Sequence, residues 1–179
     1  MKLIQLLSSA LVVCTASARL DRRSSDFLKT TAISNTPATG PITANFISSQ
    51  YGLDAPQLSA INSSSFDWWY FDVVSADLKT SLCIVFYTSL PTAFPFLPLD
   101  DVLQVGVYAS FPNGTTTSAA LNASEAYVVS YEEGSSGLFA GTGASWIGSG
   151  NDGVYSVQVD SPENGICGTF QLYAKAPAQ

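Results

Sequence analysis

Short apolar runs separated by turn residues constrain the fold of this chain more than any other feature. From Ile42 onward, none of these runs carries an apolar stripe of helical period and helix length. The candidate strands are residues 65–74, 80–89, 103–111, 126–132, 138–147, 153–160 and 168–174. Residues rich in turn chemistry join them at 75–77, 112–114, 134–137 and 148–153. This spacing predicts an all-β domain, either an antiparallel barrel or a sandwich.

Two segments depart from this pattern in ways that predict a covered surface. Residues 90–101 hold prolines among apolar side chains. Proline removes ladder donors, so we expect a loop that folds over a barrel mouth or against another domain. In residues 82–87 neither alternating set of side chains is polar, which predicts a strand buried on both faces. A partner surface would explain such a strand.

The amino terminus has the pattern of a secretory signal peptide. Lys2 precedes an apolar core over residues 3–13, and small residues lead up to Ala18. The apolar stretch is well short of the roughly 20 residues that span a bilayer, so we expect cleavage after residue 18 and no membrane span. Residues 19–41 lack a sustained period and predict a flexible leader. The folded domain is then expected over residues 42–179, in a protein of the secretory pathway that reaches the extracellular space.

The cysteines and glycosylation sequons agree with that compartment. Cys83 and Cys167 are the cysteines of the mature chain. An even pair in an oxidising compartment suggests one disulfide, and the alternative is two buried thiols. Asn62, Asn113 and Asn122 each begin an Asn-X-Ser/Thr sequon. Each is therefore a candidate glycosylation site, which must face solvent if it carries a glycan.

Charge and missing residue types exclude several classes of function. The chain has 7 Lys and Arg against 14 Asp and Glu, and loss of residues 1–18 removes only Lys2, which leaves 6 against 14, a net charge of −8. A chain this acidic would repel phosphate backbones, so nucleic acid is not an expected partner. The absence of histidine excludes a Ser–His–Asp triad and imidazole metal sites. No metal centre is expected.

The most unusual chemistry lies in residues 66–72, which read Phe-Asp-Trp-Trp-Tyr-Phe-Asp. The two faces of an extended strand here are Asp67, Trp69 and Phe71 on one side and Trp68, Tyr70 and Asp72 on the other. Each face pairs a carboxylate with aromatic side chains, although Asp is depleted in strands and costly to bury alone. The carboxylates could simply accept hydrogen bonds from indole and phenol groups in a core. Alternatively, a carboxylate in an aromatic pocket acts as acid, base or polar anchor, with a pKa raised by desolvation.

Residues 66–72 resemble the DWWYFD element near the start of fungal Diels–Alderases, which are similar in turn to bacterial carotenoid hydratases. The run Gly-Thr-Phe-Gln-Leu at 168–172, followed by Ala-Pro at 176–177, resembles the end of that family's first domain. The resemblance covers roughly residues 42–177. It implies an antiparallel lipocalin-like β-barrel or strongly curved sheet, the first of two such barrels, with the substrate pocket between them or in a barrel mouth. The chain ends where the second barrel is expected to begin.

The resemblance also implies an activity that needs no cofactor. Fungal members set the stereochemistry of Diels–Alder (4+2) cyclisations in polyketide and polyketide–peptide pathways, and related proteins hydrate or rearrange polyenes and epoxides. Such a protein folds a flexible polyene into a reactive conformer and polarises a carbonyl by hydrogen bonding. The implied class is a pericyclase or isomerase that acts on an apolar polyene or polyketide. The alternative is a secreted carrier domain that binds apolar small molecules without chemistry.

Candidate site residues follow from the same segment. Asp67, Asp72 and Tyr87 are the candidate catalytic groups, with Tyr87 added because its hydroxyl could donate to a carbonyl. The alternative for Tyr87 is a core tyrosine. The candidate lining residues of the substrate pocket are Trp68, Trp69, Tyr70 and Phe71.

Overall fold

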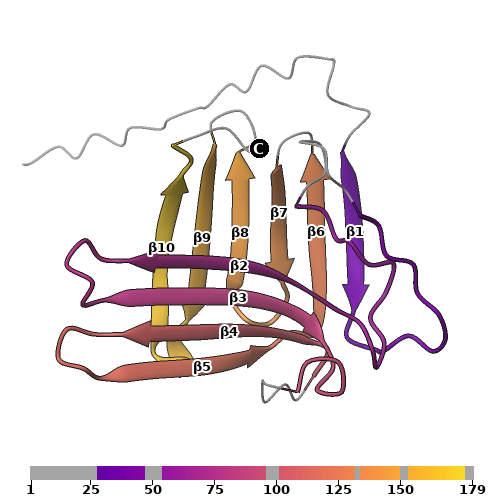
Figure 1. Ribbon diagram of the computed structural model, residues 1–179, viewed down its shortest axis with the longest axis horizontal. Helices are drawn as coiled ribbons and strands as arrows, with labels where there is room; N and C mark the ends of the chain where they lie inside the picture. The colour runs from indigo at the N-terminus through magenta and orange to yellow at the C-terminus, as the bar shows by residue number, and fades with distance from the viewer. Residues whose placement is uncertain (1–27, 47–53, 96–100, 132–133, 150–152, 176–179) are drawn as a thin grey trace, which may run out of the picture.

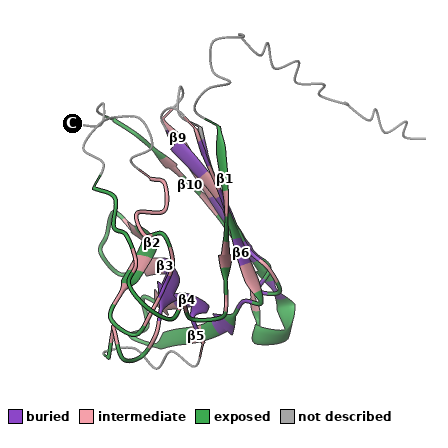
Figure 2. Cartoon of the chain, turned by 90° about the vertical axis from the view of Figure 1, so that its right-hand side faces the viewer, coloured by how far each residue is buried: buried purple, intermediate pink, exposed green. Residues whose placement is uncertain are grey.

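The chain folds into two antiparallel β-sheets that pack face to face. The computed structural model describes residues 28–46, 54–95, 101–131, 134–149 and 153–175. The strands of a four-stranded sheet run across those of a six-stranded sheet (Figure 1). Buried residues concentrate where the two sheets face one another (Figure 2). The site must therefore be sought on the faces and edges that this packing leaves open.

The six-stranded sheet has the order β1-β6-β7-β8-β9-β10, and the four-stranded sheet has the order β2-β3-β4-β5. The strands are β1 Lys29–Ser34, β2 Phe66–Val74, β3 Ser81–Ser89, β4 Leu103–Ser110, β5 Thr116–Asn122, β6 Glu125–Tyr131, β7 Gly134–Phe139, β8 Ala144–Ser149, β9 Val154–Ser161 and β10 Ile166–Tyr173. Within each sheet, strands β2 to β5 and β6 to β10 are paired in chain order as hairpins, whereas β1 pairs with β6. The 3-10 turn η1 (Pro162–Asn164) joins the last two strands. Within the described ranges, no helix is long and apolar enough to cross a bilayer.

The predicted fold class is confirmed: the described chain is all-β and antiparallel, with a curved-sheet lipocalin-like architecture. Of the two forms that were expected, it takes the open one, because the sheets stack without closing into a single barrel in the described residues. Crossed packing of two sheets explains this, since alternate side chains of both sheets interdigitate in one core.

Two strands of the structure, β1 and β5, were not predicted from the sequence. β1 lies inside the segment predicted as a flexible leader, yet it pairs with β6 along its whole length, and Ile33 packs against the core. β5 has a polar sequence because it is an edge strand of its sheet, and Leu121 is its buried anchor. Both strands carry too few apolar side chains for an alternation signal. The predicted signal peptide, residues 1–18, lies outside the described residues.

One predicted strand and one predicted turn were also wrong. Residues 138–147 are not a single strand, because they contain a hairpin between β7 and β8. Residues 134–137, predicted as a turn from their glycines and serines, instead form the first part of β7. Gly137 lies in the strand interior, where the ring of Trp146 crosses it. The glycine provides room for a side chain, not a change of chain direction.

Trp146 is the centre of the core. It is 1% exposed, and its Nε1 donates a hydrogen bond to Ser135 Oγ at 3.0 Å. Its ring centroid lies 5.0 Å from that of Trp69 and 4.7 Å from that of Phe86, both on the opposite sheet. Aromatic pairs at such separations stabilise beyond the area that they bury. Trp146 thus joins the two sheets, together with the pairs Phe86–Phe139 and Phe71–Tyr155.

We predict that Gly137→Ala destabilises the protein by about 1–3 kcal/mol through overpacking. A Cβ at this position would lie 2.0 Å from the Trp146 ring. Gly168→Ala is the matched control, because nothing lies within 4 Å of a Cβ there. Urea unfolding of both variants measures the difference. Equal midpoints for the two variants would contradict this account of the core.

Candidate functional site

The side chains of β2 alternate between the core and the solvent as predicted. Trp69 and Phe71 are each 8% exposed, whereas Trp68 is 42% and Tyr70 55% exposed. β2 is an edge strand of the four-stranded sheet, so its two faces meet very different surroundings. We call the side of this sheet that turns away from the six-stranded sheet the outer face.

Trp69 and Phe71, two of the predicted pocket-lining residues, are placed in the core. The indole Nε1 of Trp69 donates to the carbonyl oxygen of Asp54 at 2.9 Å. Phe71 packs against Phe86 and Trp146, with ring centroids 6.0 Å and 5.9 Å away. Both side chains hold the sheets together, which leaves the outward residues of β2 as the ones that a ligand can reach.

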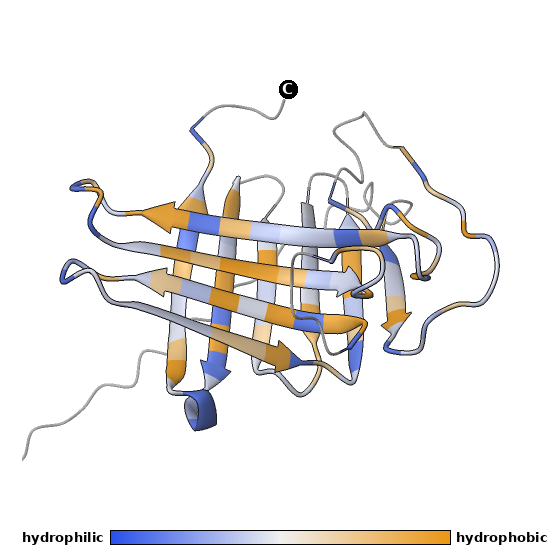
Figure 3. Cartoon of the chain, turned by 60° about the horizontal axis from the view of Figure 1, so that its bottom comes forward, coloured by the Kyte–Doolittle hydropathy of each residue, from blue (hydrophilic) through white to orange (hydrophobic). Residues whose placement is uncertain are grey.

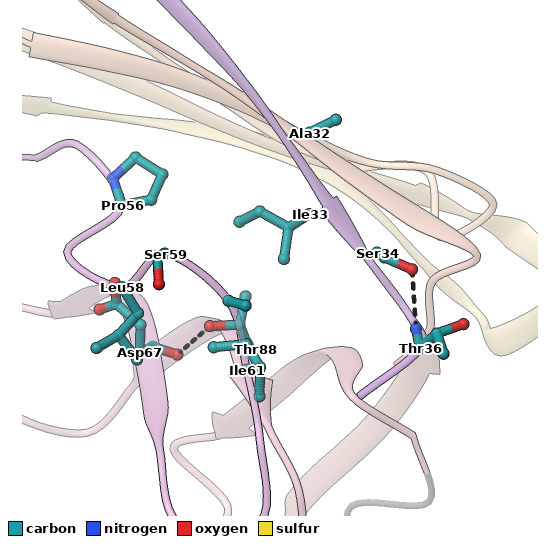
Figure 4. A pocket seen from close by; sticks show the side chains of 11 residues that line it. Ala32, Ile33, Ser34, Thr36, Pro56, Leu58, Ser59, Ile61, Asp67 and Thr88 are labelled. Atoms are coloured by element: carbon teal, nitrogen blue, oxygen red, sulfur yellow. Dashed lines mark hydrogen bonds between the residues drawn. The ribbon is translucent and has the colours of Figure 1, made fainter. Parts of the chain in front are cut away.

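Asp67 also points inward, but at the open end of the core. It lines a cavity of about 180 Å³ together with residues of β1 and of the segment 56–61 (Figure 4). Its Oδ2 accepts the backbone N–H of Gln57 and its Oδ1 accepts the backbone N–H of Trp68, each at 2.9 Å. Thr88 Oγ1 donates to its carbonyl oxygen at 3.0 Å. Asp67 therefore ties segment 56–61 to β2 as a hydrogen-bond acceptor.

Burial raises the pKa of Asp67, and the two backbone N–H donors oppose that effect. A desolvated carboxylate that already accepts hydrogen bonds from two backbone N–H groups stabilises the fold. This arrangement favours the acceptor interpretation of Asp67 over a catalytic one.

The outer face is organised in rows by the strand register. One row is Trp68, Tyr87, Gln104 and Asn122; the next is Tyr70, Val85, Gly106 and Ala120; the third is Asp72, Cys83, Tyr108 and Ser118. Three candidates from β2 and Tyr87 of β3 therefore share one surface. Figure 3 shows this sheet in front of the other, with hydrophobic segments on β2, β3 and β4.

An aromatic cluster occupies one end of the outer face. Phe66 stacks on Trp68 with centroids 5.2 Å apart, and Phe94 lies 5.1 Å and 5.3 Å from these two rings. Phe94 comes from the proline-containing segment that was predicted to fold over a barrel mouth or against another domain. Its described residues 90–95 instead place Phe94 against strand β2 of the same domain, and residues 96–100 lie outside the described ranges. We call Phe66, Trp68 and Phe94 the aromatic cluster.

Tyrosine hydroxyls lie beside the aromatic cluster. Tyr70 hydrogen-bonds Cys83, and this bond is the main cause that raises the pKa of Tyr70 to about 12. Tyr87 hydrogen-bonds Tyr108, and burial is the main cause of its raised pKa. Both hydroxyls stay protonated at neutral pH and can act as hydrogen-bond donors. Tyr70, at 55% exposed, is the one that solvent reaches more easily.

Tyr87 has the burial of a core tyrosine, although it lies on the outer face. It is 7% exposed and forms a small buried cluster with Val85 on the outer face. β3 is thus buried on both sides over much of its length, as its sequence predicted. Asp72 is exposed in the same row as Cys83 and Tyr108. The structure therefore brings Asp72, Tyr70 and Tyr87 to one surface and separates Asp67 from them.

The predicted disulfide is not present, because Cys83 and Cys167 are both free. Cys83 is on β3 of the four-stranded sheet, half-buried beside Tyr70, whereas Cys167 is exposed on β10 of the other sheet. The alternative of two buried thiols also fails for Cys167. A disulfide depends on the distance between the two residues in space, and the sequence alone does not show which sheet each cysteine joins.

With this geometry established, comparison with known proteins decides the family. A family model described as Diels-Alderase-like matches residues 24–165. The chain belongs to the Diels-Alderase-like family. The match begins within the predicted leader, in agreement with the position of β1 in the sheet. The resemblance drawn from residues 66–72 is thereby confirmed.

Two curated relatives of this Diels-Alderase-like chain are fungal proteins. The quinolone epoxide rearrangement protein penF of Penicillium thymicola is 34% identical over 137 residues, which cover 73% of this chain and 38% of the relative. The quinolone epoxide rearrangement protein asqO of Emericella nidulans is 31% identical over 134 residues, which cover 73% of this chain and 36% of the relative. The chain therefore spans less than two fifths of the length of these relatives.

The fold is shared with a solved protein. Crystal structures of CghA, alone and with Sch210972, match with a TM-score of 0.67 at 18% identity, covering 83% of this chain and 40% of CghA. Identity this low carries information on the fold alone. It supports the two-sheet architecture of the matched region.

Sequence reasoning missed several residues of the outer face. Phe66 was in the motif but not among the candidates, and Phe94 lay in a segment predicted only as a covering loop. Tyr108 and Cys83 join Tyr87 and Tyr70 through strand pairing that no local pattern shows. Only the alternation of β4 could have placed Tyr108 on the same face as Gly106.

The raised pKa of Asp67 predicts a pH dependence of stability. The folded state binds this proton more tightly than the unfolded chain does, so the associated stability is fully present below the ordinary pKa of 3.8 and is lost as pH rises through the folded pKa. Asp67→Asn removes this titration. The unfolding free energy of the native protein minus that of Asp67→Asn should fall across this window and then level off.

Urea midpoints at a series of pH values measure that difference. Asp72→Asn, from the exposed side of the same strand, controls for the loss of one negative charge from β2. A difference that grows with pH for Asp67→Asn would contradict the desolvated position of this carboxylate.

Proposed function

We propose that the outer face is one wall of a pocket that binds a flexible, apolar natural product and folds it for ring closure or rearrangement. The observation that carries this proposal is the aromatic cluster, with Trp68 42% and Phe66 40% exposed although they stack on one another. Contiguous exposed aromatic surface marks a site for a ligand or a partner. Family membership supports a small molecule as that ligand.

The chemistry proposed for this wall is positioning and hydrogen bonding. Aromatic rings hold a polyene or polyketide chain without demanding one orientation of polar groups. The Tyr70 hydroxyl, with its pKa raised to about 12, is a hydrogen-bond donor to a carbonyl or epoxide oxygen and not a strong acid. Holding the reacting carbons together lowers the entropic part of the barrier. None of these steps draws on a cofactor.

The type of reaction is supported by the names of relatives. Two of them are named quinolone epoxide rearrangement proteins. We propose a Diels–Alderase-like cyclase or isomerase activity in fungal polyketide or polyketide–peptide metabolism. Asp72 is the carboxylate close enough to the exposed hydroxyls to serve as a polar anchor, in the row of Cys83.

We further propose that a second lipocalin-like barrel supplies the opposite wall. The relatives and CghA extend well beyond the matched region, which covers 36–40% of them. β3 is buried on its outer side at Val85 and Tyr87, while neighbouring Trp68 and Tyr70 stay exposed. A covering domain would remove these exposed rings from water. Burial of apolar surface is favourable by about 25 cal/mol per Å².

A carrier function without catalysis uses the same surface. It is favoured by the position of Asp67, which turns into the core and accepts two backbone N–H groups there. The two functions differ in one measurement. A carrier binds polyenes and leaves the distribution of cyclised products unchanged, whereas an enzyme changes it.

We also propose that the protein enters the secretory pathway. The support is the signal-like amino terminus together with the positions of the sequons. Asn113 is exposed at the hairpin between β4 and β5, and Asn122 is exposed on edge strand β5. Asn62 is less open, since its Nδ2 donates to the carbonyl oxygen of Gly40 at 3.0 Å.

Trp68→Ala is predicted to weaken binding of linear polyenes at least tenfold, because it removes the centre of the aromatic cluster. Titration of the protein with a linear conjugated polyene, followed by fluorescence quenching and by product analysis, measures both binding and chemistry. Tyr173→Ala, which removes an exposed ring from β10 of the other sheet, is the matched control. An unchanged affinity of Trp68→Ala for the polyene would contradict the proposal that the outer face binds it.

Expression of the whole chain in a eukaryotic secretory host tests the localisation. We expect a product whose mass falls on treatment with an N-glycosidase, and Asn113→Gln should remove one such increment. Asn164→Gln, outside any sequon, is the control. An unglycosylated chain retained in the cytosol would argue against the secretory proposal.

A further inference from the structure

The outer face changes chemistry along the strands. At one end lies the aromatic cluster, in the middle lie the hydroxyls of Tyr70, Tyr87 and Tyr108, and at the far end lie serine and threonine side chains. The last paired row is Val74, Ser81, Ser110 and Thr116. A surface with this gradient has one direction in which an amphipathic molecule fits best.

A groove of about 370 Å³ occupies the hydroxyl-rich end. Its lining includes Cys83, Tyr108, Ser110, Thr116 and Ser118. Ser81 Oγ and Ser110 Oγ satisfy one another at 2.8 Å. Thr116 and Ser118 are exposed on edge strand β5, where their hydroxyls are open to a ligand. Hydroxyls both donate and accept, so the groove suits a neutral polar group.

The ring of Tyr108 forms the boundary between the groove and the rest of the face. A Cβ at Gly106 would lie 2.8 Å from both the ring and the hydroxyl oxygen of Tyr108, so the ring lies across this glycine. The hydroxyl is thereby directed toward Tyr87, with which it hydrogen-bonds. Gly106 is thus a positioning residue for Tyr108.

Charge excludes one class of polar group from the groove. None of the residues that line it is charged, and Asp72 is exposed in the row of Cys83, Tyr108 and Ser118. A carboxylate or phosphate on the ligand would find no cation there and would meet a like charge. The groove therefore favours a neutral amide, hydroxyl or carbonyl over an anion.

We infer that the groove binds the neutral, hydrogen-bonding end of an elongated ligand whose apolar part lies on the aromatic cluster. This inference rests on the proposed function and adds the polarity and direction of its substrate. Trp68 and Asp72 are four residues apart on one strand, so the two ends of the ligand are separated by roughly 14 Å at 3.4 Å per residue.

Three probes of equal length test the inference: a linear conjugated tetraene that ends in a primary amide, the same tetraene that ends in a methyl group, and the same tetraene that ends in a carboxylate. Dissociation constants come from quenching of intrinsic tryptophan fluorescence at neutral pH. We expect the amide to bind about tenfold more tightly than the hydrocarbon, as two net hydrogen bonds would give. The carboxylate should bind less tightly than the amide.

Two variants locate the effect. The double variant Thr116→Val and Ser118→Ala should abolish the advantage of the amide and leave hydrocarbon affinity unchanged. Gly106→Ala, which displaces the Tyr108 ring, should reduce the same advantage with the groove hydroxyls intact. Thr169→Val, on an exposed site of β10, is the control.

The possible results separate the two proposals. Equal affinity for amide and hydrocarbon, with quenching intact, overturns the inference and leaves the aromatic wall in place. An advantage of the amide that survives in the double variant also overturns it. Absence of quenching by all three probes counts against the proposed function itself.

Discussion

The packing of Trp146 across Gly137 is the contact on which the rest of the structure depends. The indole fills the space that a side chain at Gly137 would need, and it meets Trp69, Phe71 and Phe86 from the other sheet. Because a protein interior is close-packed, this ring limits how closely the two sheets approach one another. It contacts Trp69 and Phe71 on the side of β2 that is turned inward.

Once the inward side is set, the two carboxylates of the motif enter different environments. Asp67 is desolvated and accepts backbone N–H groups, so it fixes segment 56–61 and borders the small cavity beside β1. Asp72 stays in water among hydroxyl groups. One strand thus carries a structural acid on its core side and an accessible acid on its outer side, because an odd spacing of five residues places the two on opposite faces.

The outer face carries the side chains of β2 that do not pack in the core, and it is the proposed binding surface. Its rings are exposed at the aromatic cluster, and its far end is lined by hydroxyls. A hydrogen bond to Cys83 raises the pKa of Tyr70, and burial raises the pKa of Tyr87. The proposed cyclase or isomerase activity draws on these features, since positioning and hydrogen bonding lower a reaction barrier. The relatives and CghA extend beyond the matched region, and the proposed second wall would come from such an additional part.

The sequence by itself determined the all-β class, the alternation of residues 66–72, the double burial of β3 and the family. These depend on local periodicity and on a specific motif, both of which are visible in one strand. Tertiary structure alone decided that Trp69 and Phe71 are core residues, that Cys83 and Cys167 belong to different sheets, and that β1 is part of the fold. It also decided that Gly137 accommodates a ring and that Phe94 joins Trp68. The reason is physical: a period of two defines two faces, but only the partner sheet determines which of them is buried.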